Sequence, residues 1–78
     1  MPSPTYTTLL KKVSEYVEPV KAKEVLDRYI TGGGASPDTF SSEDLIRLMT
    51  AVTTATKLYV SDKGRRDEMV ARIKLMPT

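Results

Sequence analysis

The stretch FSSEDLIRLMTAVTTATKLYV, residues 40–60, constrains the fold of this chain more than any other segment. Two helix-start signals coincide at its beginning. Ser41 and Asp44 have the capping-box spacing, in which the serine hydroxyl accepts from the Asp44 amide and the carboxylate accepts from the Ser41 amide. Phe40 and Leu45 occupy the two positions of a hydrophobic staple around the same N-cap. The pattern predicts a helix that begins at Ser41 and occupies the rest of this stretch.

The apolar face of this helix is broad. At 100° per residue, six apolar side chains share one arc and four more widen it, so polar residues cover only about a third of the circumference. The six are Leu45, Leu48, Met49, Val52, Ala55 and Tyr59, and the four are Ile46, Ala51, Leu58 and Val60. A helix this apolar is usually covered on several sides. We therefore expect it to be the most buried element, with the other helices packed around it.

Length and composition bound the rest of the fold. A chain of 78 residues makes one domain, near the size at which a single core is only just sufficient. The residues are 40% hydrophobic and 28% charged, with a net charge of +2, which is typical of a globular protein. Because Cys and His are absent, neither a disulfide nor a thiolate metal site can supplement the core, whereas self-association can.

A proline divides the N-terminal half. Pro19 disfavours the helical conformation for Glu18, the residue before it. The apolar stripe after Pro19 is also centred roughly half a turn around the axis from the stripe before it, so one straight helix would face two opposite cores. We expect a break near Glu18, with Pro19 as the first residue of a second helix. A single, sharply kinked helix is the alternative.

The helix boundaries follow from local signals. Ser3 is the expected N-cap of the first helix, with Pro4 at its first position. Gly32 is expected to take the left-handed position after the second helix. The Gly-rich loop 32–40 is the expected mobile segment, and Ser36-Pro37-Asp38 is expected to form a short N-capped turn inside it.

The C-terminal third is expected to form a last helix that Pro77 stops. Either Ser61 caps this helix or Gly64 terminates the preceding one, and the sequence leaves both open. Glu68 and Arg72 have the spacing of an i,i+4 ion pair. The prediction is one all-α domain over residues 1–78, with frayed ends at 1–3 and 77–78. Its four helices are 4–17, 19–31, 41–60 and 64–76.

The composition argues against an enzyme. Without His or Cys there is no imidazole base, thiol nucleophile or common zinc site. The carboxylate pairs Glu43–Asp44 and Asp67–Glu68 are sequence neighbours, which point about 100° apart on a helix and do not converge. The triplet at 32–34 has neither the P-loop nor the dinucleotide-binding spacing, and a helix terminator is the simpler interpretation. We expect no catalytic residue, cofactor or metal.

Positive charge is concentrated between Lys57 and Lys74, a segment that contains six basic and three acidic residues. A basic segment at a helix N-terminus can bind a phosphate through side chains and free amides. Against nucleic-acid binding, Asp67 and Glu68 lie in the first turn, and a net charge of +2 is small for that function. A solvated basic face is the simpler interpretation. The candidate anion or nucleic-acid contacts are Lys63, Arg65, Arg66, Arg72 and Lys74.

Tyrosine and methionine side chains are the candidates for contacts with a partner protein. They lie at helical spacing on apolar faces, so they serve either the core and its rim or an interface. The candidate partner contacts are Tyr6, Tyr16, Tyr29, Met69 and Met76.

The expected function follows largely by elimination. The apolar runs are too short for a membrane span, and no signal-peptide pattern is present, so we expect a cytoplasmic protein. We expect a small non-enzymatic protein–protein interaction module, regulatory subunit or adaptor, whose partner is another protein or a second copy in a homo-oligomer. The alternative is a small nucleic-acid-binding regulator that uses the basic C-terminal helix.

Overall fold

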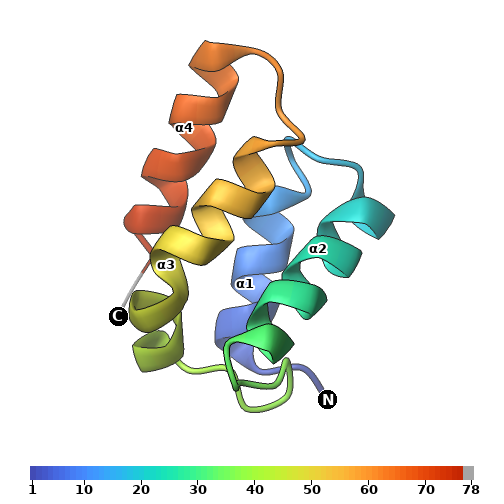
Figure 1. The fold of residues 1–78 in the computed structure, drawn as a ribbon, viewed down its shortest axis with the longest axis vertical. Coiled ribbons are helices and arrows are strands. Elements are labelled where there is room, and N and C mark those ends of the chain that lie inside the picture. The colour runs from blue at the N-terminus through green and yellow to red at the C-terminus, as the bar shows by residue number, and fades with distance from the viewer. Residues whose placement is uncertain (77–78) are drawn as a thin grey trace.

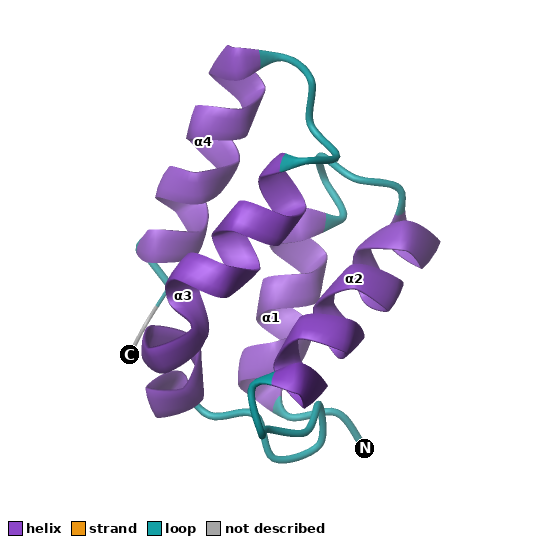
Figure 2. Cartoon of the chain, viewed as in Figure 1, coloured by secondary structure: helices purple, strands orange, loops and turns teal. Residues whose placement is uncertain are grey.

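The computed structural model describes residues 1–76, and these residues form four helices and no strand (Figure 1). The helices are α1 (Pro4–Val13), α2 (Pro19–Gly32), α3 (Ser42–Lys57) and α4 (Lys63–Lys74). Viewed as in Figure 2, α2 and α3 lie in front of α1 and α4. Each of α1 and α3 packs against all three other helices, whereas α2 and α4 do not touch. The predicted all-α, four-helix architecture is confirmed.

The start of α3 is as predicted. The Ser41 hydroxyl accepts from the Asp44 amide at 3.2 Å, and the Asp44 carboxylate accepts from the Ser41 amide at 3.2 Å. Phe40 and Leu45, the two staple residues, are both buried in the core. These contacts fix the direction in which the chain enters the longest helix of the described residues.

The end of α3 differs from the prediction, because the helix stops at Lys57 rather than at residue 60. The next three residues continue in turns, in which each amide donates to the carbonyl three positions earlier, such as Val60 to Lys57 at 3.2 Å. This change of direction buries Val60 in the core. Leu58 and Tyr59 therefore leave the helical face on which the sequence pattern placed them, and both are exposed.

Helix α3 supplies more buried side chains than any other helix, and two of them are polar. The hydroxyls of Thr53 and Thr56 donate to the carbonyls of Met49 and Val52, at 2.8 and 2.9 Å. A threonine that donates within its own helix leaves no unsatisfied polar group when it is buried. Ile46 is exposed, however, so the predicted apolar face is only partly covered.

Two separate helices, α1 and α2, are joined by residues 14–18, and the alternative of one kinked helix is wrong. Glu18 is not helical, with φ of −49° and ψ of 132°, and Pro19 is the first residue of α2. Helix α1 ends at Val13, four residues earlier than predicted, because the chain then makes tight turns, with the Tyr16 amide donating to the Val13 carbonyl at 3.0 Å. These turns place Val17 in the core.

The loop after α2 is tied to the N-terminus. Gly34, with φ of +84°, takes the left-handed conformation that was expected of Gly32, which is still helical. The Ser36 hydroxyl accepts from the Asp38 amide at 3.2 Å, which confirms the predicted turn. Ser3 caps α1, and its amide also donates to the Pro37 carbonyl at 2.9 Å. Ser3 is therefore ordered, whereas the prediction placed it in a frayed end. The mobility of this loop stays a prediction.

Helix α4 begins with a cap that the sequence did not single out. The Asp62 carboxylate accepts from the Arg65 amide at 2.9 Å, and Gly64 lies inside the helix, so neither predicted alternative holds. Leu75 is the C-cap, and the helix ends before Pro77. The expected roles of residues 77–78 lie outside the described part of the chain.

Candidate functional site

Three of the five candidate partner contacts are in the core. Tyr6, Met69 and Met76 have exposed fractions of 1%, 0% and 4%, so they do not meet a partner at the surface of this fold. Met69 lies on the face of α4 that packs inward, and Met76 follows the C-cap of that helix and packs in the same core. The prediction that these three side chains form partner contacts is therefore wrong. Of the other two, Tyr29 is exposed and Tyr16 is half-buried.

Tyr6 has a structural hydrogen bond that explains its burial. Its hydroxyl donates to the carboxylate of Asp27 on α2, and the same carboxylate accepts from Lys23 at 2.7 Å. Burial, and then the bond to Asp27, raise the pKa of Tyr6 well above its ordinary value. The residue thus joins α1 to α2 as a neutral donor.

Tyr16 contacts two arginines of α4. The guanidinium carbons of Arg65 and Arg72 lie 5.2 and 5.8 Å from the centroid of its ring. Arg72 also donates to the Tyr16 hydroxyl at 3.2 Å and pairs with Glu15 at 2.7 Å. These two bonds raise the pKa of Arg72, with the tyrosine bond the larger cause. Arg72 therefore pairs with Glu15 and not, as predicted, with Glu68.

The five predicted anion contacts do not form one surface. Arg65 and Arg72 turn towards α1, and Lys63 pairs with Asp67 at 3.5 Å. Asp62 occupies one amide at the N-terminus of α4. Of the remaining two contacts, Arg66 is half-buried and Lys74 is exposed near the other end of the helix. Nucleic-acid binding by α4 stays a prediction, with less support than the sequence gave it.

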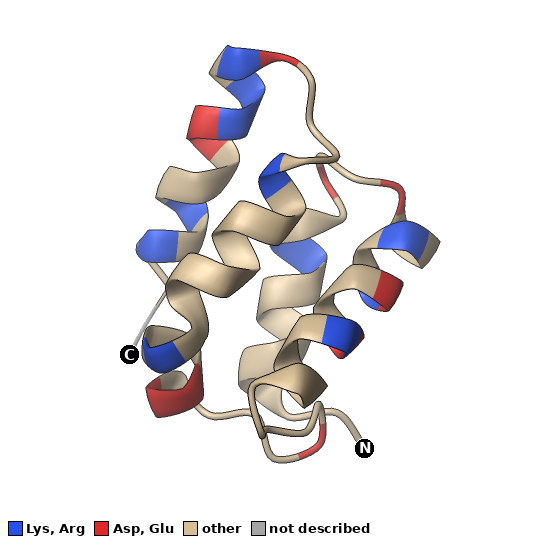
Figure 3. Ribbon diagram, in the orientation of Figure 1, with Lys and Arg blue, Asp and Glu red and all other residues tan. Residues whose placement is uncertain are grey.

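A groove between α1 and α4 brings together a different set of basic side chains. It has a volume of about 520 Å³ and is lined by Thr7, Thr8, Lys11, Lys12, Glu15 and Arg72. Figure 3 shows basic segments on both helices. The sequence pattern did not single out Lys11 or Lys12 as site residues, so this site was missed. The only signal was their adjacency, because the facing arginine comes from a distant part of the chain.

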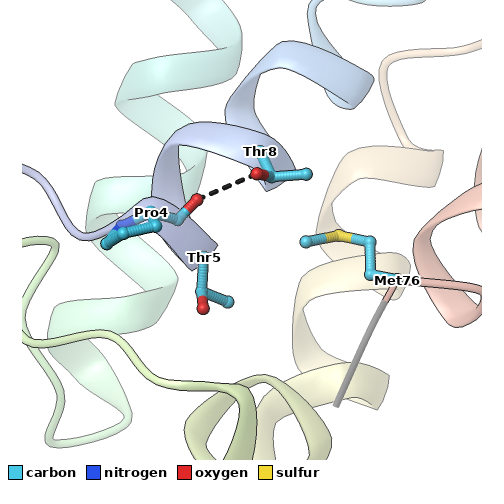
Figure 4. A pocket seen from close by; sticks show the side chains of 4 residues that line it. All are labelled: Pro4, Thr5, Thr8 and Met76. Carbon is cyan, nitrogen blue, oxygen red and sulfur yellow. Dashed lines mark hydrogen bonds between the residues drawn. The ribbon is translucent and has the colours of Figure 1, made fainter.

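A shallower hollow lies beside it. It has a volume of about 170 Å³ and is lined by Pro4, Thr5, Thr8 and Met76. In Figure 4 the Met76 side chain extends towards α1, and the Thr8 hydroxyl donates to the Pro4 carbonyl at 2.9 Å. No lining side chain ionises, and one of the two lining hydroxyls, that of Thr8, is already donated within the helix. The hollow is therefore poorly equipped for chemistry or charge recognition.

Helix α2 starts and helix α3 finishes at the same end of the molecule (Figure 1), and large apolar side chains are exposed there. Val20, Leu58 and Tyr59 have exposed fractions of 72%, 77% and 46%. The ammonium of Lys21 lies 5.8 Å from the centroid of the Tyr59 ring, which joins the two helix ends. We call these three apolar residues the end patch. The sequence pattern placed Leu58 and Tyr59 on the apolar face of the third helix and did not single out Val20, so the exposure of these residues was not foreseen.

The described residues contain neither a metal site nor a membrane-spanning helix. Within residues 1–76, acidic side chains do not come together in groups that could hold a metal ion. None of the four helices in that part of the chain combines the length and the apolar character needed to cross a membrane. No protein-family model, curated protein or solved structure matches the chain. Its function must therefore be inferred from its own geometry.

Proposed function

We propose that this chain is a non-enzymatic protein-interaction module that pairs with a second copy of itself through the end patch. The observation that carries the proposal is the exposure of Val20, Leu58 and Tyr59 at one end of a small domain whose other large apolar side chains are mostly buried. Apolar side chains gathered at a surface are typical of protein interfaces. A regulatory or adaptor role and a cytoplasmic location remain expectations from the sequence.

The charges beside the end patch favour a second copy as the occupant. Glu18 is exposed at the start of α2, and Lys57 is exposed at the end of α3. A two-fold axis brings residue i of one protomer to residue j of the other, and residue j to residue i. Two copies related in this way can place each Glu18 near the Lys57 of the other copy, so that the apolar centre has a complementary rim.

The expected affinity is modest. Stable interfaces bury about 800 Å² on each partner, which is more than three side chains supply. The interface must therefore include neighbouring residues, and we expect a dissociation constant on the order of micromolar or weaker. Because apolar contact dominates, pairing should persist when salt screens the exposed charges.

Sedimentation of two matched variants tests the proposal. Leu58→Asp places a charge in the end patch, and Ile46→Asp places one at another exposed apolar position of α3, about 18 Å away along the helix. We expect dimers of the wild type and of Ile46→Asp, and monomers of Leu58→Asp at the same concentration. Loss of pairing in both variants, or pairing in neither variant nor wild type, contradicts the proposal. Circular dichroism confirms that each variant is folded.

A further inference from the structure

The groove between α1 and α4 concentrates positive charge, only part of which forms an ion pair within the domain. Its ionisable lining is Lys11, Lys12 and Arg72 against one carboxylate, Glu15, an excess of two positive charges. Within residues 1–76 neither lysine forms an ion pair, whereas Arg72 pairs with Glu15 at 2.7 Å. Lysines in the last turn of a helix also complement its dipole, but that role requires neither a hollow nor a facing arginine.

Two threonines one turn earlier add a hydroxyl donor to this groove. Thr7 precedes Lys11 by four residues and Thr8 precedes Lys12 by four, so each pair lies along one side of α1. The Thr8 hydroxyl already donates to the Pro4 carbonyl at 2.9 Å. Thr7 is exposed, and its hydroxyl donates to no group among the described residues. It is therefore a free donor beside Lys11.

We infer that this groove binds a small ligand that carries a compact polyanionic group, of which diphosphate is the best match. A volume of about 520 Å³ lies within the range of known small-molecule sites. We expect recognition by charge, because every residue that lines the groove carries a hydroxyl or a charged group. Two ammonium groups and one guanidinium suit a group with several negative oxygens, each of which can accept a charge-assisted hydrogen bond.

The Glu15 carboxylate competes with an anionic ligand for Arg72. Its carboxylate accepts from Arg72 at 2.7 Å, and the hydroxyl of Tyr16 accepts from the same guanidinium at 3.2 Å. A bound phosphate must share Arg72 with Glu15 or displace the Glu15 carboxylate. The negative charge of that carboxylate also repels the phosphate. A monoanion has little advantage over Glu15, whereas a diphosphate also gains contacts with both lysines. The wild type should therefore bind weakly, and binding should tighten when the Glu15 charge is removed.

Titration of isotopically labelled protein with inorganic pyrophosphate at low salt tests the inference through amide chemical shifts. The groove variant is Lys11→Gln with Lys12→Gln. The charge-matched control is Arg28→Gln with Lys74→Gln, at exposed positions on α2 and α4 outside the groove. We expect saturable shifts in α1 and α4 together. Affinity should fall about tenfold or more in the groove variant and less than about threefold in the control, since exposed charge contacts contribute most at short range.

The variant Glu15→Gln separates a specific site from general attraction. It should bind pyrophosphate several-fold more tightly than the wild type, because Arg72 becomes available and a repulsive charge is lost. Equal losses in the groove and control variants overturn the inference. So do weaker binding by Glu15→Gln, the absence of saturable shifts, and binding of duplex DNA without binding of pyrophosphate.

A parallel titration with ADP identifies the source of the diphosphate group. Equal affinities for ADP and pyrophosphate support recognition of the free group, and tighter binding of ADP supports a nucleotide ligand. Binding of ADP alone, with shifts outside α1 and α4, contradicts the assignment of the site. Because the lysines are at the surface, circular dichroism should show unchanged helical content in every variant.

Discussion

Tyr6 shows how one buried polar atom makes stability depend on pH. Its pKa is raised above the ordinary value of 10.0 by burial and by the bond to Asp27. The unfolded chain loses this phenolic proton near pH 10 whereas the folded chain keeps it, so stability falls as pH rises beyond that value. Tyr6→Phe should lower the free energy of unfolding by about 1 kcal/mol at pH 7. Urea unfolding should show that the difference in free energy of unfolding between variant and wild type is smaller above pH 10 than at pH 7. A difference that stays constant contradicts this account.

Asp44 has the opposite dependence. Its hydrogen bond with Arg47, and then those with Ser41, lower its pKa. A carboxyl group with a depressed pKa stabilises the fold above its unfolded value of about 3.9, and the contribution disappears as pH falls through the folded value. Asp44→Asn should therefore melt below the wild type at pH 7 and together with it in strong acid. Equal differences in melting temperature at both pH values contradict the assignment.

Contacts between particular side chains were harder to predict from the sequence than the positions of the apolar faces. Arg72 has a suitable partner four residues earlier in Glu68, yet it binds Tyr16, 56 positions away, because α4 packs beside the end of the first helical segment. Tyr6 and Tyr16 share one apolar stripe in the sequence. The fold buries Tyr6 against Asp27 and leaves Tyr16 half-buried under two arginines. Only the packing of distant helices separates these roles.

At the scale of helices, the starts of the first three helices were predictable, whereas the start of the fourth and the ends of the first and third were not. Ser3, Pro19 and Ser41 carry start signals within a few residues, and all three were placed correctly. The first and third helices end early, because Val17 and Val60 must turn into the core and no glycine marks either end. A helix end that depends on tertiary burial has no local signature.

The contact between the end of α2 and α3 predicts the effect of a single methyl group. A Cβ added at Gly33 would lie 2.5 Å from Leu48 Cδ2, whereas one added at Gly32 would meet nothing within 4 Å. Gly33→Ala forces a packed leucine to move, so it should be less stable than Gly32→Ala by about 1 kcal/mol or more. Gly32→Ala should be neutral or slightly stabilising, since it restricts the unfolded chain. Chemical denaturation measures both, and equal stabilities would refute the close approach.

At the scale of the whole molecule, the all-α, four-helix architecture was predictable and both candidate surfaces were not. Apolar periodicity and proline placement define four helices within one short chain. The end patch exists because α3 stops at Lys57 and exposes Leu58 and Tyr59. The groove exists because α1 and α4 pack side by side. Each surface combines segments far apart in the sequence, which helical patterns alone do not bring together.

The mass in solution tests the central proposal, pairing through the end patch, most directly. Light scattering of the wild type over a wide range of concentration, at low and high salt, should show the mass rising from 8.7 kDa towards twice that value. The rise should be similar at both salt concentrations, because the contact is apolar. A mass that stays at 8.7 kDa at every concentration, or that increases only when duplex DNA is added at low salt, would contradict the proposal.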